Sequence, residues 1–198
     1  MQEDEKQLTR EESLQLISQM ISKAKNDYVD TGIAALMWGC IITFCGLITF
    51  SNNWWKISWL NNVWWLPALA IIPQLIISNN ERKRKKFKTY NDDATGGIWL
   101  SFAITLFLLT YYINRYQIPD TNSLFIIIYG IPTFASGYAR RFRPMIIGGI
   151  ACWIFAIAAM HVPFPYTMLL TAAAAQLAWF IPGLILRRRY RKAKEQHV

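Results

Sequence analysis

The sequence predicts an all-α fold: a polytopic membrane protein whose six transmembrane helices form three hairpins, preceded by an N-terminal amphipathic helix. Three observations predict this class. Hydrophobic residues make up 54% of the 198 residues, six long stretches carry no charged side chain, and nearly all basic residues lie in segments that flank the same ends of these stretches. A helix on the surface of a soluble domain would instead carry a charged stripe at every third or fourth residue.

The chain divides into three parts where its composition changes. Residues 1–28 are predicted to form a cytoplasmic amphipathic helix, because Thr9 and Glu12 have the spacing of a capping box and apolar residues follow at intervals of three and four. Residues 29–187 are predicted to form the six-helix transmembrane domain, and residues 188–198 a basic cytoplasmic tail. The acidic start of the chain lacks the basic region of a cleavable signal, so we expect the first span to act as an uncleaved anchor.

Six uncharged stretches supply the predicted spans, namely residues 31–50, 63–78, 97–113, 124–138, 145–161 and 167–186. Each is close to the ~20 residues that cross a hydrocarbon core of ~30 Å, and aromatic residues at the interfaces complete the shorter ones. The second, fourth and sixth stretches each contain an Ile-Pro pair and then reach a basic cluster. This recurrence predicts three helical hairpins of similar design.

The distribution of positive charge indicates how the chain is threaded. The formal net charge is +9, and all 21 basic residues except Lys56 and Arg115 fall on one side of the predicted spans. Short loops rich in Lys and Arg stay in the cytoplasm, so we predict a multi-pass protein of the bacterial cytoplasmic membrane with both termini in the cytoplasm. Topology and attraction to a bilayer with anionic headgroups account for the charge, which argues against nucleic acid as a partner. The residues predicted to contact lipid headgroups or a cytoplasmic protein partner are Arg82, Lys83, Arg84, Lys85, Lys86, Arg140, Arg141, Arg143, Arg187, Arg188 and Arg189.

The uncharged spans limit the chemistry that the protein can perform. No ionisable side chain lies at mid-depth of a span, which leaves proton relays and intramembrane carboxylate pairs without support. The sequence contains no recognisable catalytic motif, metal-ligand spacing or phosphate-binding glycine loop, so we predict no catalytic residue, no metal and no cofactor, and an enzyme is disfavoured. The three cysteines all lie inside predicted spans, which excludes a secreted disulfide framework.

Two glutamines and three prolines are the remaining candidates for a solute site. Each proline removes a backbone donor and crowds the carbonyl four residues earlier, so three kinks near the inner ends of the even-numbered spans could open a vestibule. Ordinary kinks whose freed groups are satisfied by neighbouring helices are the alternative that we favour. The glutamine amides can donate and accept across helices, and we favour plain interhelical hydrogen bonding over solute binding. These candidates are Pro73, Gln74, Pro132, Gln176 and Pro182.

Aromatic and small residues predict where the bundle meets the bilayer surface and where it packs most closely. Five of the nine tryptophans lie in or beside the first outer loop, which predicts an aromatic belt at the headgroup level. Residues 145–161 and 167–186 are rich in Gly and Ala, which let helix backbones approach closely. We therefore expect this hairpin to be the tightest part of the fold, with a homo-oligomer contact through the same face as the alternative.

One stretch resembles a known family. The run of residues 140–150, Arg-Arg-Phe-Arg-Pro-Met-Ile-Ile-Gly-Gly-Ile, continues to Cys152-Trp153 and is similar to a stretch in an uncharacterised family of bacterial multi-pass membrane proteins. Segments within residues 12–33 and residues 170–175 resemble that family as well. The resemblance spans most of the chain and implies a six-helix inner-membrane protein. It implies no activity, because the family has no assigned function.

Two functions from different classes fit the sequence. The first, which we favour slightly, is a non-catalytic membrane protein whose basic cytoplasmic face docks a protein partner or scaffolds an assembly, because nearly all residues outside the spans lie on that side. The second is a small solute-binding protein or transporter with its site at the kinked inner ends of the second, fourth and sixth helices. Transport without a buried ionisable group would require a neutral or lipid-like substrate.

Overall fold

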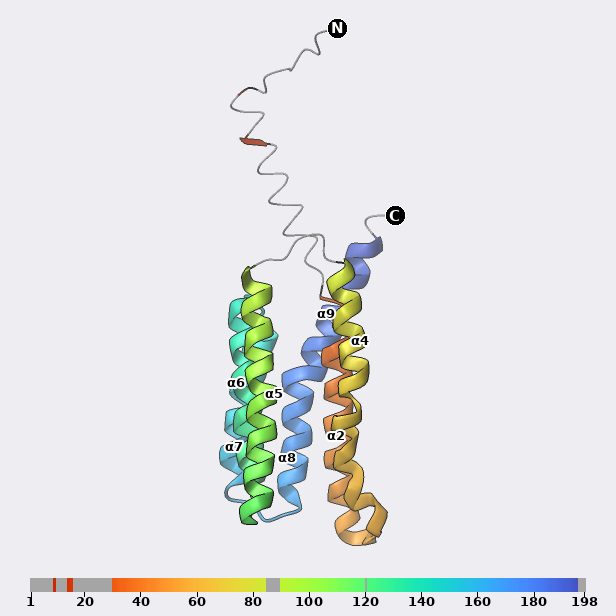
Figure 1. Cartoon of the computed structure of the whole chain (residues 1–198), viewed down its shortest axis with the longest axis vertical. Coiled ribbons are helices and arrows are strands. Elements are labelled where there is room, and N and C mark those ends of the chain that lie inside the picture. Colours follow the sequence, from red (N-terminus) through yellow and green to blue (C-terminus); the bar gives the residue numbers. More distant parts are fainter. Residues whose placement is uncertain (1–8, 10–13, 16–29, 85–89, 120, 196–198) are drawn as a thin grey trace.

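A computed structural model of the chain describes residues 9, 14–15, 30–84, 90–119 and 121–195 (Figure 1). All regular secondary structure in these residues is helical, which confirms the all-α class for the described part of the chain. The predicted N-terminal helix over residues 1–28 and its capping box lie outside the described residues, apart from Thr9, Leu14 and Gln15.

The described helices line up in rods that run alternately up and down (Figure 1). One rod joins a 3₁₀ segment to two short helices, and another joins two helices through a π-helical turn. The elements in chain order are α2 (Ile33–Trp55), η1 (Ser58–Trp65), α3 (Leu66–Leu69), α4 (Ile71–Arg84), α5 (Tyr90–Tyr116), α6 (Asn122–Ala139), α7 (Arg143–Ala159), α8 (Tyr166–Ala175), the π-helical turn η2 (Gln176–Phe180) and α9 (Ile181–Glu195).

Four helical segments are long and apolar enough to cross a membrane. They are Ile33–Trp55, Ser58–Lys83, Asp93–Tyr116 and Tyr166–Ala193, with 23, 26, 24 and 28 residues. The other two rods are shorter, since α6 has 18 residues and α7 has 17. The described chain therefore has helices typical of a membrane protein. Four of the six predicted spans correspond to helical segments that are both long enough and apolar enough to cross a membrane.

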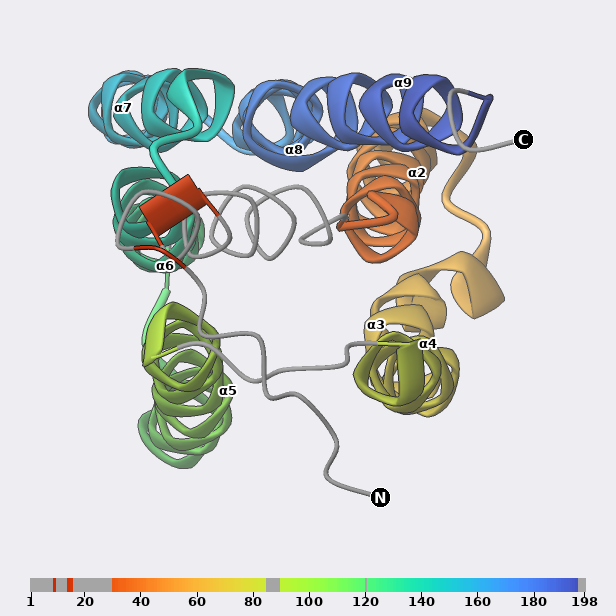
Figure 2. The same cartoon turned by 90° about the horizontal axis from the view of Figure 1, so that it is seen from above.

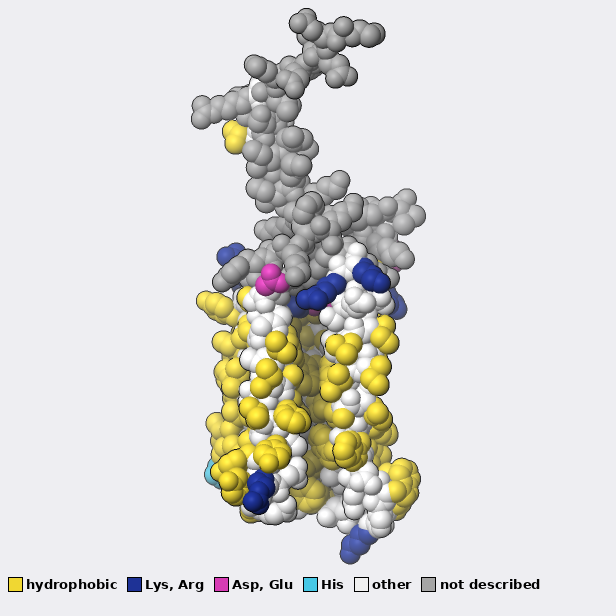
Figure 3. All heavy atoms as spheres, viewed as in Figure 1, with side chains coloured by type: hydrophobic (Ala, Val, Ile, Leu, Met, Phe, Trp, Pro, Cys, Tyr) yellow, Lys and Arg dark blue, Asp and Glu magenta, His cyan; other side chains and the backbone are white. Residues whose placement is uncertain are grey.

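Seen from above, the rods follow an open U (Figure 2). Each rod contacts the next one around the U. The order is α5, α6, α7, the rod of α8, η2 and α9, then α2 and finally α4. The two ends of the U, α4 and α5, make no contact with each other in the described residues. The space-filling view shows a furrow between them, with apolar side chains along both walls (Figure 3). We call this feature the α4–α5 furrow.

Glycines set the closest helix contacts. A Cβ added at Gly39 would lie 2.7 Å from the backbone nitrogen of Phe180, and one added at Gly149 would lie 2.7 Å from the Cβ of Phe134. Such positions bring helix backbones together where lipid gives no hydrophobic drive to associate. The most extensive packing in the described residues joins α6 to α7, so the expectation that α7 and α8 form the tightest hairpin is wrong. The reason is that α6 contributes glycines of its own, Gly130 and Gly137, to the contact with α7.

The small residues of the last two predicted spans are used inside the single chain. Gly148 packs against the backbone of Leu177 and Ala178, and Ala156, Ala172 and Ala174 are buried. These small residues therefore pack within the single chain, and a homo-oligomer contact stays a prediction.

The three Ile-Pro prolines differ in their effect on the helices. Pro73 lies in the first turn of α4, just after the break at Ala70. Pro132 lies inside α6, which continues through it as one helix. Pro182 is the second residue of α9, which directly follows the π-helical turn. Instead of three similar kinks, the structure has a break in one rod, a continuous helix in the second and a widened turn in the third.

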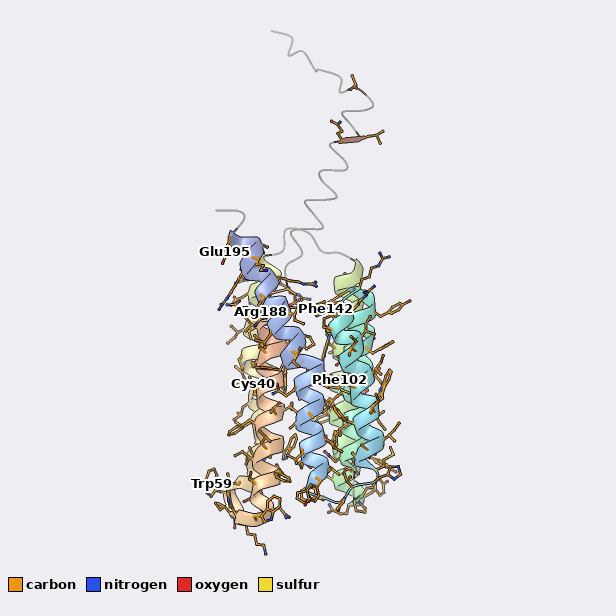
Figure 4. All side chains as sticks on the ribbon, turned by 180° about the vertical axis from the view of Figure 1, so that it is seen from behind. Cys40, Trp59, Phe102, Phe142, Arg188 and Glu195 are labelled. Atoms are coloured by element: carbon orange, nitrogen blue, oxygen red, sulfur yellow. The ribbon has the colours of Figure 1, made fainter. Side chains whose placement is uncertain are left out.

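The end of the bundle opposite Arg188 carries the aromatic residues expected at a bilayer surface (Figure 4). Trp54, Trp55, Trp59 and Trp65 are all exposed there, Trp59 with 73% of its surface accessible. The turn between α2 and η1 is held by Asn52, whose amide nitrogen donates to Asn61 Oδ1 and whose Oδ1 accepts from the Ile57 backbone, both at 2.8 Å. These exposed rings agree with the aromatic belt expected from the sequence.

Candidate binding site in the interior of the bundle

Five aromatic rings meet on the inner side of the U. Trp179 is at their centre, with its ring centroid 5.3 Å from that of Tyr129, 6.2 Å from Trp99 and 6.4 Å from Trp38. Phe102 completes the group, 5.5 Å from Trp99 and 5.7 Å from Tyr129. These five residues, here called the interior aromatic cluster, come from α2, α5, α6 and η2. Three of these pairs are edge to face and two are tilted, arrangements in which aromatic rings attract one another in addition to burying apolar surface.

The π-helical turn places Trp179 at the centre of the cluster. A π turn fits one extra residue into the helix, and such turns are frequent at functional sites. Trp179 is 5% exposed, and its Nε1 donates to Thr133 Oγ1 at 2.9 Å. The Thr133 hydroxyl in turn donates to the Tyr129 carbonyl at 2.8 Å, which is the i−4 bond typical of a threonine in an apolar helix. The indole is therefore fixed both by ring packing and by a hydrogen bond to α6.

The two glutamines singled out from the sequence both contact α2 next to this cluster. Gln74 Oε1 accepts from Trp38 Nε1 at 2.9 Å, and Gln176 Nε2 donates to Thr43 Oγ1 at 2.8 Å. Gln74 lies on α4, and Gln176 is the first residue of the π-helical turn. The interhelical hydrogen bonding favoured from the sequence is what the structure has for both side chains. The structure also brings both amides to the edge of the aromatic cluster, through Trp38 and through the turn that carries Trp179.

The three candidate prolines do not converge on one point. Pro132 and Pro182 are fully buried, and Pro132 precedes Thr133, the hydrogen-bond partner of Trp179. Pro73 is exposed, so it is not a wall of the interior. The vestibule, which we favoured less than ordinary kinks, therefore gains no support from the position of Pro73.

One end of the bundle carries most of the described basic residues. Arg140 forms an ion pair with Asp30, and the Thr31 hydroxyl donates to Glu81, so ionic and hydrogen-bonded contacts join the two residues before the N-cap of α2 to α4 and to the C-terminal end of α6. The Arg189 guanidinium lies 5.1 Å from the Phe142 ring centroid, and that of Arg187 lies 5.6 Å from Tyr190. Figure 4 places Phe142 and Arg188 at this end and Trp59 at the other.

The remaining basic residues predicted as lipid or partner contacts divide into two groups. Arg82, Lys83, Arg141, Arg143 and Arg188 are exposed. Lys85 and Lys86, together with the side chain of Arg84, lie outside the described residues.

A row of polar side chains on α6 connects the basic end to the aromatic cluster. Tyr129, Thr133, Ser136 and Arg140 are spaced by four, three and four residues, so they share one face of the helix. Ser136 is fully buried, with 0% of its surface accessible, and its hydroxyl has no hydrogen-bond partner among the described residues. We call these four residues the polar track.

Sequence reasoning missed all five interior aromatic residues, although the positions of the tryptophans carried a signal. Five of the nine lie in or beside the outer loop, and the other four are Trp38, Trp99, Trp153 and Trp179. Three of those four belong to the interior cluster, while Trp153 packs against Gly130 and donates to the Ile127 carbonyl at 3.2 Å. Tryptophans inside a span, away from the belts, were therefore the mark of the cluster.

Comparison with known proteins adds no relative. No protein-family model matches the sequence, and no curated protein and no solved structure matches it significantly. The resemblance to a bacterial multi-pass family therefore stays a prediction. In the described residues, no group of three or more His, Cys, Asp or Glu side chains is placed to hold a metal ion.

Proposed function

We propose that the protein is an integral membrane protein that binds an amphipathic, lipid-like molecule on the inner side of its helix bundle, with entry from the bilayer through the α4–α5 furrow. The observation that carries this proposal is the interior aromatic cluster, which lies in a U whose two end helices do not touch in the described residues. The sequence suggested a neutral or lipid-like substrate for a solute-binding protein. The geometry favours the interior aromatic cluster over the three proline kinks as the place where such a substrate would bind.

The chemistry around the cluster favours a molecule without charge at mid-depth. The side chains at its edge are neutral, namely the amides of Gln74 and Gln176 and the hydroxyls of Thr43 and Thr133. Aromatic faces pack well against alkyl groups, and amides or hydroxyls orient an ester or hydroxyl group. A hydrophilic ion would leave its charge unpaired in this region at high cost in free energy.

The proposal includes the threading of the chain. We infer six spans arranged as three hairpins in a bacterial cytoplasmic membrane, with the basic end and both termini in the cytoplasm. Among the described basic residues, only Lys56 and Arg115 belong to the opposite end. An α-helix of 17 residues, the length of α7, is about 26 Å long, close to the hydrocarbon thickness when flanking aromatics are added. Labelling of intact cells with an impermeant maleimide should modify Lys56→Cys and spare Lys83→Cys; the reverse result would invert the topology.

Photolabelling tests the binding proposal. A long-chain alcohol with a diazirine in its chain is added to the full-length protein in nanodiscs, and labelled residues are mapped by mass spectrometry. Labelling at Trp99 and Trp179 should saturate and be displaced by excess unlabelled alcohol. Labelling at Phe107, which is 73% exposed on α5, should rise in proportion to probe concentration and serves as the control. Non-saturable labelling at all three positions would refute the interior site.

Partner docking at the basic end is a second candidate function, and the gathering of arginines on α9 and the α6–α7 turn favours it. It makes a separate prediction. Deleting residues 1–28 should remove a co-purifying protein and leave the photolabelling unchanged, whereas retention of every partner would rule docking out.

A further inference from the structure

We infer that the outer face of α7 and the turn before it form a surface site for an anionic phospholipid, with the phosphate at Arg141 and Arg143 and an acyl chain along the helix. This inference rests on the threading proposed above, because it needs α7 to cross the bilayer. It does not need the interior aromatic cluster, since no residue of α7 belongs to that cluster.

The turn between α6 and α7 presents two arginines together. Phe142 is 5% exposed, and its backbone N–H donates to the Gly137 carbonyl at 2.8 Å. The backbone of Phe142 is extended, and in an extended chain the flanking side chains point away from the middle one. Arg141 and Arg143 are both exposed, one on each side of the buried ring. The buried ring therefore anchors the turn that carries both guanidinium groups.

The positive charge of this turn is not balanced within the described part of the chain. Neither Arg141 nor Arg143 forms an ion pair with a described residue, and α7 has no acidic residue in its first turn. A third guanidinium, that of Arg189, lies 5.1 Å from the ring centroid of Phe142. Cations gathered at one turn repel one another, and a bound anion offsets that repulsion. A guanidinium also matches the oxygens of a phosphate with its planar fork of N–H donors.

An apolar stripe on α7 begins one turn after Arg143. Counted from Arg143, its four isoleucines follow at spacings of four, three, four and three residues, so all five side chains share one face of the helix. The isoleucines are 43–65% exposed. From first to last they extend about 15 Å along the helix axis, half of a hydrocarbon core of ~30 Å and therefore the depth of one leaflet. This α7 stripe consists of Ile147, Ile150, Ile154 and Ile157.

A second exposed stripe, on α5, is the natural comparison. Its residues also share one helix face, and they are 53–73% exposed. Toward the basic end this face leads to the exposed Asp93, where the α7 stripe leads to Arg143. A phosphate therefore meets two guanidinium groups at the head of α7 and a carboxylate at the head of α5. The α5 stripe consists of Leu100, Ile104, Phe107 and Tyr111.

A bilayer lipid fits this surface better than an acidic protein segment does. A soluble partner can pair with the arginines, but it cannot cover a stripe that lies inside the hydrocarbon core. Each arginine near the membrane surface contributes about fivefold to the affinity for an anionic lipid. Two arginines thus give a preference of about 25-fold at most, so the lipid exchanges with the bilayer and is lost when detergent replaces it.

The test uses two trace lipid probes, phosphatidylglycerol and phosphatidylcholine, with the same diazirine in one acyl chain. The full-length protein is held in nanodiscs of phosphatidylcholine, and labelled residues are mapped by mass spectrometry. The ratio of phosphatidylglycerol to phosphatidylcholine labelling on the α7 stripe should exceed that on the α5 stripe by more than about fivefold, because two arginines head only the α7 stripe.

Charge-removing substitutions assign the preference to the turn. Arg143→Gln should lower the ratio on the α7 stripe about fivefold, and the double variant with Arg141→Gln should bring it to the level of the α5 stripe. The unfolding midpoint in detergent should not change, because neither arginine pairs with a described residue. The matched control is Arg82→Gln, which removes the same charge from an exposed position on α4 and should keep the ratio.

Equal ratios on the two stripes would overturn the site, and so would a ratio on the α7 stripe that the double variant leaves unchanged. Loss of the preference in phosphate but not in chloride of the same ionic strength would show a site for free anions and overturn the lipid as occupant. Its loss on addition of a polyglutamate peptide would assign the arginines to an acidic protein partner instead. Absence of labelling along α7 by both lipids would overturn the span and the proposed threading, and it would leave the interior site to its own test.

Discussion

Replacing Trp179 by alanine is expected to abolish saturable photolabelling of the interior and to lower the free energy of unfolding by about 3–5 kcal/mol, the usual cost of truncating a buried tryptophan. Trp179 contacts Trp38, Trp99 and Tyr129, so its removal separates the rings of α2, α5 and α6 at once. It also leaves Thr133 without the indole N–H as donor. Unfolding is measured by denaturation in mixed micelles, and labelling as for the wild type.

Two controls isolate the role of this indole. Trp179→Phe keeps a six-membered ring in place but loses the hydrogen bond to Thr133 and the volume of the second ring, so its cost should be well below that of Trp179→Ala and labelling should persist. Trp59→Ala removes a tryptophan that is 73% exposed and should leave both quantities unchanged. Wild-type labelling in the Trp179→Ala protein would show that the aromatic cluster is only structural.

Replacing Gly39 by leucine is expected to separate α2 from the π-helical turn and to cost about 3 kcal/mol, the upper part of the usual range for overpacking. An added Cβ there would lie 2.7, 2.8 and 2.9 Å from the backbone nitrogen, Cβ and Cα of Phe180. Two of these atoms are backbone, which cannot rotate away. Because Trp38 precedes Gly39, the shift would also move Trp38 from Trp179, and saturable labelling should fall with stability.

Gly97→Leu is the matched control for this substitution. A Cβ at Gly97 would meet nothing within 4 Å, and glycine in a helix interior costs about 1 kcal/mol relative to a good helix former. This variant should therefore be as stable as the wild type or slightly more stable. Equal destabilisation by Gly39→Leu and Gly97→Leu would mean that α2 and the turn are not packed as described.

The helical class could be predicted from the sequence because a long uncharged stretch in lipid must satisfy its own backbone hydrogen bonds, and an α-helix does this within a single segment. The order of packing could not be predicted. Small residues on the last two predicted spans indicated a close contact, yet Gly130 and Gly137 of α6 make the more extensive contact with α7. Sequence shows which helices can approach closely, and it does not show which of them become neighbours.

The candidate site was predictable only in part. Gln74 and Gln176 stood out because polar side chains are rare in apolar spans, and both lie at the edge of the interior cluster. The tryptophans inside the spans were overlooked, because the five tryptophans in or beside the outer loop account for an interfacial belt and drew the interpretation to that end of the chain. The π-helical turn that places Trp179 follows from packing rather than from a local sequence signal, so the convergence of Trp38, Trp99 and Trp179 is visible only in three dimensions.

Native mass spectrometry of the full-length protein, extracted gently from its own membrane, tests the central claim most directly. We predict a discrete added mass in the range of one lipid-like molecule, absent from the Trp179→Ala protein. A bare protein mass, or an added mass that persists unchanged in the Trp179→Ala variant, would contradict binding at the interior aromatic cluster. An added mass of protein size alone would instead point to docking at the basic end.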